Sequence, residues 1–293
     1  RWLPCLLDMT VILLAHSYFL RLDTKQWEKM RPYPPLGTLY AAEVLRNVGH
    51  DVAVFDAMLA EGEHEFADAL SRHQPRHVVL FEDNFNFLSK MCLARMREAA
   101  LAMVAMAKDA GCRVAVAGAD VTDHADVYLA GGADVCILGE GDHTVTEVVD
   151  AWLAHPHDPS YDGIDGIARM SRGSVSTSRS RSIERHPDVF GRPARDLIDI
   201  EAYRNAWVDH HGRFSLNMVS TRGCPYRCNW CAKPIWGQRY AMRTPADVAK
   251  ELASVKIEIG PDHIWFADDI FGLRSDWLAQ FAYCVNELDA VIP

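Results

Sequence analysis

Residues 221–231 are Thr221-Arg222-Gly223-Cys224-Pro225-Tyr226-Arg227-Cys228-Asn229-Trp230-Cys231, which places three of the chain's eight cysteines within eight positions. They follow a run typical of a β-strand, residues 214–219. Three thiolates at C-x3-C-x2-C spacing can surround one metal centre. Two kinds of centre are compatible with this spacing, a structural zinc site and an iron–sulfur cluster.

The number of cysteines favours the iron–sulfur cluster. Structural zinc takes four protein ligands, and a zinc ribbon needs a second C-x2-C pair, which the sequence lacks. A zinc knuckle completed by a distant histidine is the remaining alternative. A [4Fe–4S] cluster on Cys224, Cys228 and Cys231 would leave one iron open to a substrate or cofactor.

The pattern C-x3-C-x-aromatic-C, with Trp230 at the aromatic position, resembles the signature of radical S-adenosylmethionine (SAM) enzymes. The resemblance implies that the amino and carboxylate groups of SAM chelate the open iron. One electron from the cluster then cleaves a C–S bond and gives a 5′-deoxyadenosyl radical. It also implies an external one-electron reductant of the flavodoxin or ferredoxin type, and it makes Trp230 a candidate cofactor contact.

The composition indicates a globular protein with room for two domains, since the chain has 293 residues, 49% hydrophobic and 24% charged. A formal charge of −10 argues against a nucleic-acid-binding surface. The basic, serine-rich run at 169–185 is expected to be a solvated hairpin or loop.

Without a signal peptide or a membrane-spanning apolar run, we expect a reducing, cytoplasmic location and no membrane span. The sequence starts without methionine, so its natural start is expected at Met9, or it is a fragment.

From residue 9 to 155 the pattern predicts a flavodoxin-like, Rossmann-like α/β domain with a five-stranded parallel sheet. The right-handed crossover rule puts the carboxyl ends of all its strands at one ligand-binding edge. The expected strands are 10–15, 51–55, 77–81, 113–117 and 134–138, and the expected helices are 36–48, 63–72, 89–110, 123–130 and 143–154.

The loops at this edge hold the candidate cofactor-binding residues. Small residues there let a planar or phosphate-bearing ligand approach backbone N–H groups. The pattern G-x-G-x-x-G is missing after the first strand, which disfavours NAD and FAD. The candidates are Ser17, Tyr18, Pro35, Leu36, Gly37, Glu82, Asp83, Asn84, Gly118, Asp120, Val121, Gly139, Glu140 and Gly141.

Together these loops resemble the cobalamin-binding domain that precedes the radical SAM domain in one subclass of that superfamily. The matching points are Pro-Pro-Leu-Gly at 34–37 and Gly-Glu-Gly at 139–141, with Asp142 where glutamate is more usual. The string D-x-H-x-x-G, which supplies a histidine to cobalt, is absent. The resemblance therefore implies base-off cobalamin without that ligand. His16 and His124 are candidates for a substitute ligand, although a loop histidine without metal is the simpler interpretation.

Residues 156–213 are expected to form a connector with a small hairpin, 163–170 and 173–178, and a helix near 201–208. A linker of this length with apolar content should pack on both domains and hold cobalt near the cluster.

Residues 214–293 resemble the truncated start of the partial (βα)6 barrel of radical SAM enzymes. After the cysteines we expect a helix capped by Thr244 and running to 259, a strand at 263–267, a helix at 276–288 and a third strand opening at 290. The substrate-binding strands would lie outside this sequence, so the fragment should turn over poorly.

Asp268 and Asp269, at the end of the second expected strand, are candidates to bind the SAM amine, with helix capping as the alternative. Arg222, Lys233, Arg239 and Arg243 are candidates for its carboxylate.

The sequence thus predicts a cobalamin-dependent radical SAM enzyme acting on a small molecule, by methyl transfer to, or rearrangement of, an unactivated carbon. The alternative is a non-catalytic, cobalamin-sensing module with zinc on the three cysteines.

Overall fold

The computed structural model describes residues 11–86, 93–229 and 235–292. Within them, seven strands form one sheet in the order β2-β1-β3-β4-β5-β6-β7. The first five are parallel, which confirms the predicted parallel α/β sheet. The strands are β1 (Ile12–Ala15), β2 (Val52–Phe55), β3 (His77–Phe81), β4 (Arg113–Ala117), β5 (Val135–Ile137), β6 (Ile167–Ser171) and β7 (Ser174–Thr177).

The hairpin β6–β7 extends this sheet, whereas the sequence suggested only a hairpin within a connector. Strand β6 pairs antiparallel with β5, Ile137 opposite Ile167, and β7 pairs with β6. Ile167 and Ala168 are buried in the two cores of the first domain, so the hairpin continues its apolar layers. An antiparallel strand needs no crossover helix, which is why no βα rhythm marks it in the sequence.

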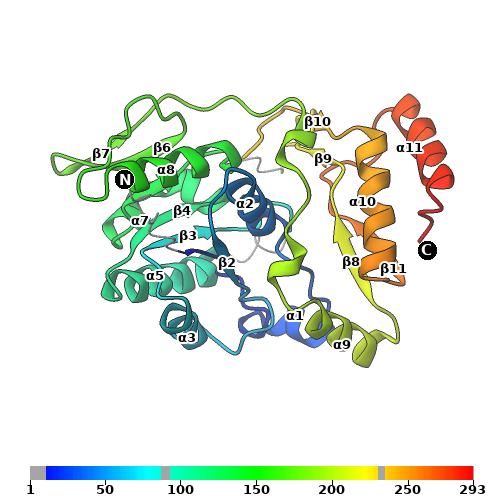
Figure 1. Cartoon of the computed structure of the whole chain (residues 1–293), viewed down its shortest axis with the longest axis horizontal. Helices are drawn as coiled ribbons and strands as arrows, with labels where there is room; N and C mark the ends of the chain where they lie inside the picture. The colour runs from blue at the N-terminus through cyan, green and yellow to red at the C-terminus, as the bar shows by residue number, and fades with distance from the viewer. Residues whose placement is uncertain (1–10, 87–92, 230–234, 293) are drawn as a thin grey trace, which may run out of the picture.

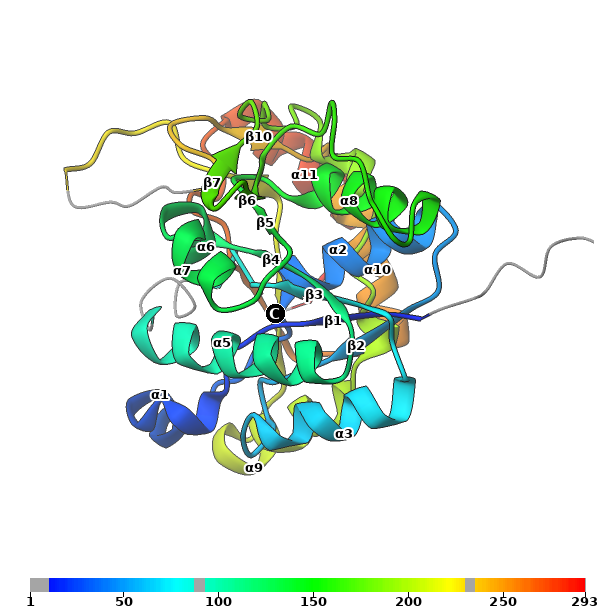
Figure 2. The ribbon, with the colours of Figure 1, turned by 90° about the vertical axis from the view of Figure 1, so that its left-hand side faces the viewer.

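Helices cover both faces of the sheet (Figure 2). Helices α2 (Leu36–Asn47) and α8 (Asp142–Ala154) pack on one face through Leu45 and Trp152. Helices α3 (His64–His73), α5 (Leu93–Asp109), α6 (Ala119–Asp123) and α7 (Ala125–Ala130) pack on the other. Strands buried on both sides read as continuous apolar runs, as in β1, Ile-Leu-Leu-Ala.

The second unit begins with two parallel strands, β8 (Ser215–Met218) and β11 (His263–Phe266), beside helices α10 (Pro245–Glu258) and α11 (Ser275–Glu287) (Figure 1). Thr244 caps α10 by accepting from Asp247 N, as expected. Short strands β9 (Thr221–Arg222) and β10 (Ala241–Met242) pair antiparallel around the cysteine loop.

The third strand expected at 290 is wrong for the described residues, because 290–292 make no strand ladder. Ala290 is fully buried in the core under α10 and α11 and Ile292 packs against it, whereas Val291 is exposed. The pattern of apolar residues thus indicated burial at two of the three positions but not strand pairing.

Between the two units lie η2 (Pro187–Phe190), η3 (Arg195–Leu197) and α9 (Ile200–His211), and two further elements follow β1: η1 (Leu20–Leu22) and α1 (Thr24–Lys29). Trp207 on α9 donates to Pro32 O at 2.6 Å, and Tyr203 donates to Asp56 at 2.6 Å. Tyr203 and Trp207 share an apolar cluster with Phe214, so α9 contacts both units.

None of the helices in the described ranges has the length and apolarity needed to cross a bilayer.

Gly37, at the start of α2, lies against the end of β3. A Cβ there would be 3.0 Å from Glu82 O and 3.1 Å from Asn84 N, while its own N–H donates to Asp83 Oδ1 at 3.0 Å. The Pro-Pro-Leu-Gly turn therefore brings two backbones together.

We expect Gly37→Ala to lower the free energy of unfolding by about 1–3 kcal/mol, because the overpacking outweighs the gain in helix propensity. Urea denaturation of the purified chain measures this. Gly62→Ala is the control, since its Cβ would meet only the mobile side chain of His64, and it should change stability by less than about 0.5 kcal/mol. Equal effects of the two substitutions would contradict the packing argument.

Candidate functional site

Cys224 and Cys228 lie on one accessible loop, residues 223–229, directly after β9. Cys224 is partly exposed and Cys228 is exposed. Cys231, Trp230 and Lys233, also predicted for this site, lie outside the described residues. Two thiols on a single surface loop suit a cluster that must admit a cofactor to its open iron.

Nothing in the described part of the chain completes a zinc site around these two sulfurs. The group of three possible metal ligands found there is Glu61, His64 and Glu65, at the start of α3.

The loop starts at Gly223, which the sequence analysis did not single out. Gly223 has φ of 78°, and a Cβ there would overlap the carbonyl oxygen of Arg239 and lie 2.9 Å from Trp236 Cβ. Only glycine fits this left-handed, crowded position. The two ends of the loop are therefore packed against each other.

Arg222, directly before Gly223, is only 3% exposed and is held by the loop after β5. Its Nη1 lies 2.9 Å from Glu140 Oε1 and 2.8 Å from Asp142 Oδ2. Its guanidinium carbon lies 4.1 Å from the Phe190 ring centroid. Burial lowers the pKa of Arg222, but Asp142 and Glu140 outweigh this and the net shift is upward. Arg222 is thus occupied by the first domain, and its predicted role with SAM finds no support in these contacts.

Glu140 holds both ends of the cysteine loop. Besides Arg222, its Oε1 accepts from Trp236 Nε1 at 3.2 Å, and its Oε2 accepts from Glu184 N at 2.6 Å. Burial raises the pKa of Glu140, and Arg222 opposes that shift. This predicted cofactor contact thus bonds to the protein itself.

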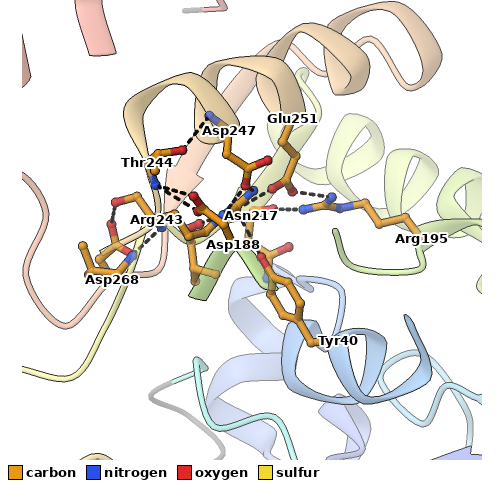
Figure 3. Close-up of polar contacts among 12 residues, drawn as sticks. Tyr40, Asp188, Arg195, Asn217, Arg243, Thr244, Asp247, Glu251 and Asp268 are labelled. Carbon is orange, nitrogen blue, oxygen red and sulfur yellow. Dashed lines mark hydrogen bonds and ion pairs between the residues drawn. The ribbon is translucent and has the colours of Figure 1, made fainter. Parts of the chain in front are cut away.

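Asp268, predicted to bind the SAM amine, fixes the chain just before the cysteine loop. It accepts from Ser220 N at 2.7 Å, Ser220 Oγ at 2.5 Å and Thr221 N at 2.8 Å (Figure 3). Burial raises its pKa to about 6, against the effect of these hydrogen bonds. The neighbouring Asp269 is exposed.

Arg243 lies in a second buried ion network (Figure 3). It contacts Asp247 at 2.7 Å, Glu251 at 2.5 Å and Val219 O at 2.8 Å, and it donates to the Tyr40 hydroxyl at 3.2 Å. Its donors are therefore occupied within the protein.

Arg195, from the connector, joins the same network by bonding to Glu251 at 2.7 Å and to Asn217 O at 2.9 Å. Of the four predicted partners of the SAM carboxylate, Arg239 remains exposed in the described structure. The sequence analysis missed Arg195, Glu251 and Trp236, since no local pattern distinguishes a buried charge from a surface one.

The acidic residues at the edge of the first sheet also bond to the protein. Glu82 accepts from Ser17 N at 3.1 Å, and burial raises its pKa. Asp83 accepts from Gly37 N at 3.0 Å. Asp120 accepts from Arg97 at 2.7 Å. These predicted cofactor residues therefore order the loops.

Several other candidates at this edge are packed or only partly accessible. Leu36, Asn84 and Val121 are buried, and Pro35 precedes α2. Gly118 faces the Glu82 side chain, where a Cβ would lie 2.7 Å from Glu82 Cβ. Gly139 and Asp120 keep partial exposure.

A cavity of about 430 Å³ opens at the carboxyl end of β1. Its size is in the range of small-ligand sites. Ser17 and Tyr18, both predicted, contribute to its wall, which is completed by Phe19, Leu22, Asp23, Thr24, Lys25, Ala94, Arg95 and Met96.

His16 and His124 do not form a common site. His16 is fully buried, with Nε2 2.9 Å from Asp56 Oδ1 and 3.1 Å from Ala57 N. His124 is exposed and lies 3.8 Å from Asp120. His16 is thus engaged within the protein, and the interpretation of a loop histidine without metal stays a prediction.

Comparison with known proteins finds similarity along most of the chain. Residues 31–149 match the B12 binding domain family. The chain is 24% identical over 222 residues, 75% of its length, to the anaerobic magnesium-protoporphyrin IX monomethyl ester cyclase of Synechocystis sp.. It is 25% identical over 250 residues, 82% of its length, to the hopanoid C-3 methylase of Methylococcus capsulatus. It spans only 42% and 43% of these two curated relatives.

Two solved structures share the fold across both units. One is the radical S-adenosylmethionine methyltransferase TsrM from Kitasatospora setae with cobalamin and a [4Fe-4S] cluster bound. It has a TM-score of 0.65 and 18% identity, and the match covers 94% of this chain and 52% of that one. The other is the cobalamin-dependent S-adenosylmethionine radical enzyme OxsB. Its TM-score is 0.63 and its identity 16%, over 96% of this chain and 37% of that one.

The raised pKa of Asp268 makes the stability of the folded chain depend on pH. Because its folded pKa lies above that of the unfolded chain, protonated Asp268 adds stability that is fully present below about pH 4 and is lost as the pH rises through about 6. From pH 4.5 to 7.5, wild type should therefore lose about 2 kcal/mol of unfolding free energy relative to Asp268→Asn.

Denaturant unfolding at the two pH values measures this difference. Asp269→Asn, at the exposed neighbour, controls for the change in net charge and should shift stability by less than about 0.5 kcal/mol at pH 7.5. Parallel pH dependence in wild type and Asp268→Asn would show that the carboxyl is not desolvated.

Proposed function

We propose that this chain, which carries a B12-binding domain at residues 31–149 and is related along most of its length to cobalamin-dependent radical SAM enzymes, binds both cofactors of that chemistry. Cys224, Cys228 and Cys231 hold a [4Fe–4S] cluster, and the carboxyl edge of the large sheet holds cobalamin. The observation that carries the proposal is the direct contact of Glu140, in a loop of that edge, with Arg222 and Trp236 on either side of the cysteines.

The residues present fit the two groups. The cysteine loop offers thiols at the surface, and thiolates are the ligands that iron–sulfur clusters take. Cobalamin is a large cofactor, and the cavity beside Ser17 and Tyr18 can admit part of it. His16 is held by Asp56, which supports cobalamin bound without His16 as a ligand.

When bound, the cluster supplies an electron for cleavage of SAM and cobalamin supplies a cobalt centre able to carry a methyl group. The protein's own residues position these groups. Asp268 fixes Ser220 and Thr221 ahead of the cysteine loop. Exposed Arg239 and Asp269 offer opposite charges for the carboxylate and amine of SAM.

The reaction we propose is methyl transfer to, or rearrangement of, an unactivated carbon in a small molecule, with an external one-electron reductant of the flavodoxin or ferredoxin type. A methylase and a cyclase are among the curated relatives, which supports this pair of reactions. Since the chain spans less than half of their lengths, we place the substrate-binding strands outside these residues.

Anaerobic reconstitution with iron and sulfide should yield about four iron and four sulfide per chain, as a [4Fe–4S] cluster requires. Cys224→Ala should lose most of this iron, measured by elemental analysis and by the electron paramagnetic resonance (EPR) signal of the reduced protein. Cys284→Ala, at a partly exposed thiol on α11, is the control and should keep it. Stoichiometric zinc without iron would instead support a zinc-bearing sensor module.

Filling the cavity beside β1 should weaken cobalamin binding without affecting iron. Ala94 is exposed and lines the cavity, so Ala94→Trp should raise the Kd for hydroxocobalamin about tenfold or more through steric exclusion. Glu98→Trp, one turn further along α5 and outside the cavity, is the matched control. Unchanged affinity in Ala94→Trp would place cobalamin elsewhere on the edge.

A further inference from the structure

We propose that Glu140 is a positioning residue that clamps both stems of the cysteine loop to the cobalamin edge, so that filling one cofactor site changes the affinity of the other. This coupling rests on the two-cofactor function proposed above.

The clamp is a single carboxylate oxygen shared by two donors. Glu140 Oε1 lies 2.9 Å from Arg222 Nη1 and 3.2 Å from Trp236 Nε1. Arg222 is two residues before Cys224, and Trp236 is five residues after Cys231. The described residues on the two sides of the cysteines, Arg222 and Trp236, thus meet at one side chain from the other domain.

Both stems are also packed tightly around this contact. Gly223 packs on Trp236 Cβ at a distance that admits no side chain. Trp236 also packs against Phe85, with ring centroids 5.1 Å apart. Arg222 and Glu140 are 3% and 4% exposed, and Arg222 also bonds to Asp142 of the same loop at 2.8 Å, so two carboxylates compensate its buried charge.

Glu140 is equally fixed to the ligand edge of the sheet. Glu140 lies between Gly139 and Gly141. Gly139 is partly exposed, and its N–H donates to Thr122 Oγ1 at 3.0 Å. A Cβ at Gly141 would lie 2.9 Å from Ile137 and from Phe81, at the ends of β5 and β3. A ligand that contacts this loop therefore acts on Glu140, and Glu140 acts on the cysteine stems.

Stability alone does not account for such a pair. Replacing a buried ion pair by apolar residues of similar volume is often neutral or stabilising, whereas an ion pair specifies one geometry. Here the specified geometry is the orientation of the cysteine loop relative to the cobalamin edge.

The test measures the Kd for hydroxocobalamin by equilibrium dialysis in four forms. These are the wild type and Glu140→Gln, each with its reconstituted cluster and each in a cluster-free Cys224→Ala/Cys228→Ala background. We expect the cluster to change the Kd of the wild-type form at least about fivefold, the lower range of allosteric coupling, and that of the Glu140→Gln form less than twofold.

The EPR spectrum of the reduced cluster gives a readout that a merely structural role would not move. Adding cob(II)alamin, which does not oxidise the reduced cluster and whose own EPR signal is recorded separately and subtracted, should shift the cluster signal in wild type and leave it unchanged in Glu140→Gln. Glu251→Gln is the matched control, because Glu251 is as deeply buried and pairs with two arginines but contacts neither stem residue. It should keep the coupling even where it lowers stability.

Should Glu140→Gln fail to fold, Trp236→Phe removes one donor and keeps the aromatic ring, and it should reduce the coupling. If the cluster changes the Kd for hydroxocobalamin equally in wild type and variant, or not at all in wild type, the clamp is overturned. Iron and cobalamin binding by the wild type would then still support the proposed function. A wild-type chain that binds neither cofactor overturns the proposed function, and the clamp with it.

Discussion

The guanidinium of Arg222, buried between Glu140 and Asp142, is the interaction on which the relation of the two units depends. It joins the residue before the cysteine loop to the loop after β5, some eighty positions earlier in the chain. Two carboxylates and aromatic faces surround it, so its charge is compensated in a place that water does not reach. Removing either side would leave an uncompensated charge in the seam.

The seam around this ion pair is also apolar. One core cluster contains Leu36 and Tyr40 from α2, Phe190 from the connector, and Val219 and Trp236 from the second unit. Apolar burial supplies the attraction between the units, and the ion pairs select the register in which they meet. The network of Arg195, Arg243 and Glu251 repeats this arrangement further along the same seam (Figure 3).

The acidic residues at the ligand-binding edge of the large sheet are bound within the first domain. Glu82, Asp83 and Asp120 each accept hydrogen bonds from backbone or from an arginine of their own domain. Among the described residues, the accessible surface of the edge includes the cavity beside Ser17 and the partly exposed residues after β4 and β5, such as Gly139. A preorganised edge of this kind loses little conformational entropy on binding a ligand.

The sequence by itself determined the five βα units, the cysteine spacing and the start of α10 at Thr244, because each depends on a short-range period or on contacts within one turn. Only the tertiary structure decided that β6 and β7 extend the sheet and that Ala290 and Ile292 pack without strand pairing. It also decided that Arg222 and Glu140 bond to each other across the two units and that Arg243 bonds to Tyr40 of the first domain. The sequence suggested ligand contacts for all three charged residues. The same charged residue type occurs in ligand sites and in buried ion pairs. Because the partner in a buried ion pair lies tens of residues away in the sequence, only the packing of the domains distinguishes the two cases.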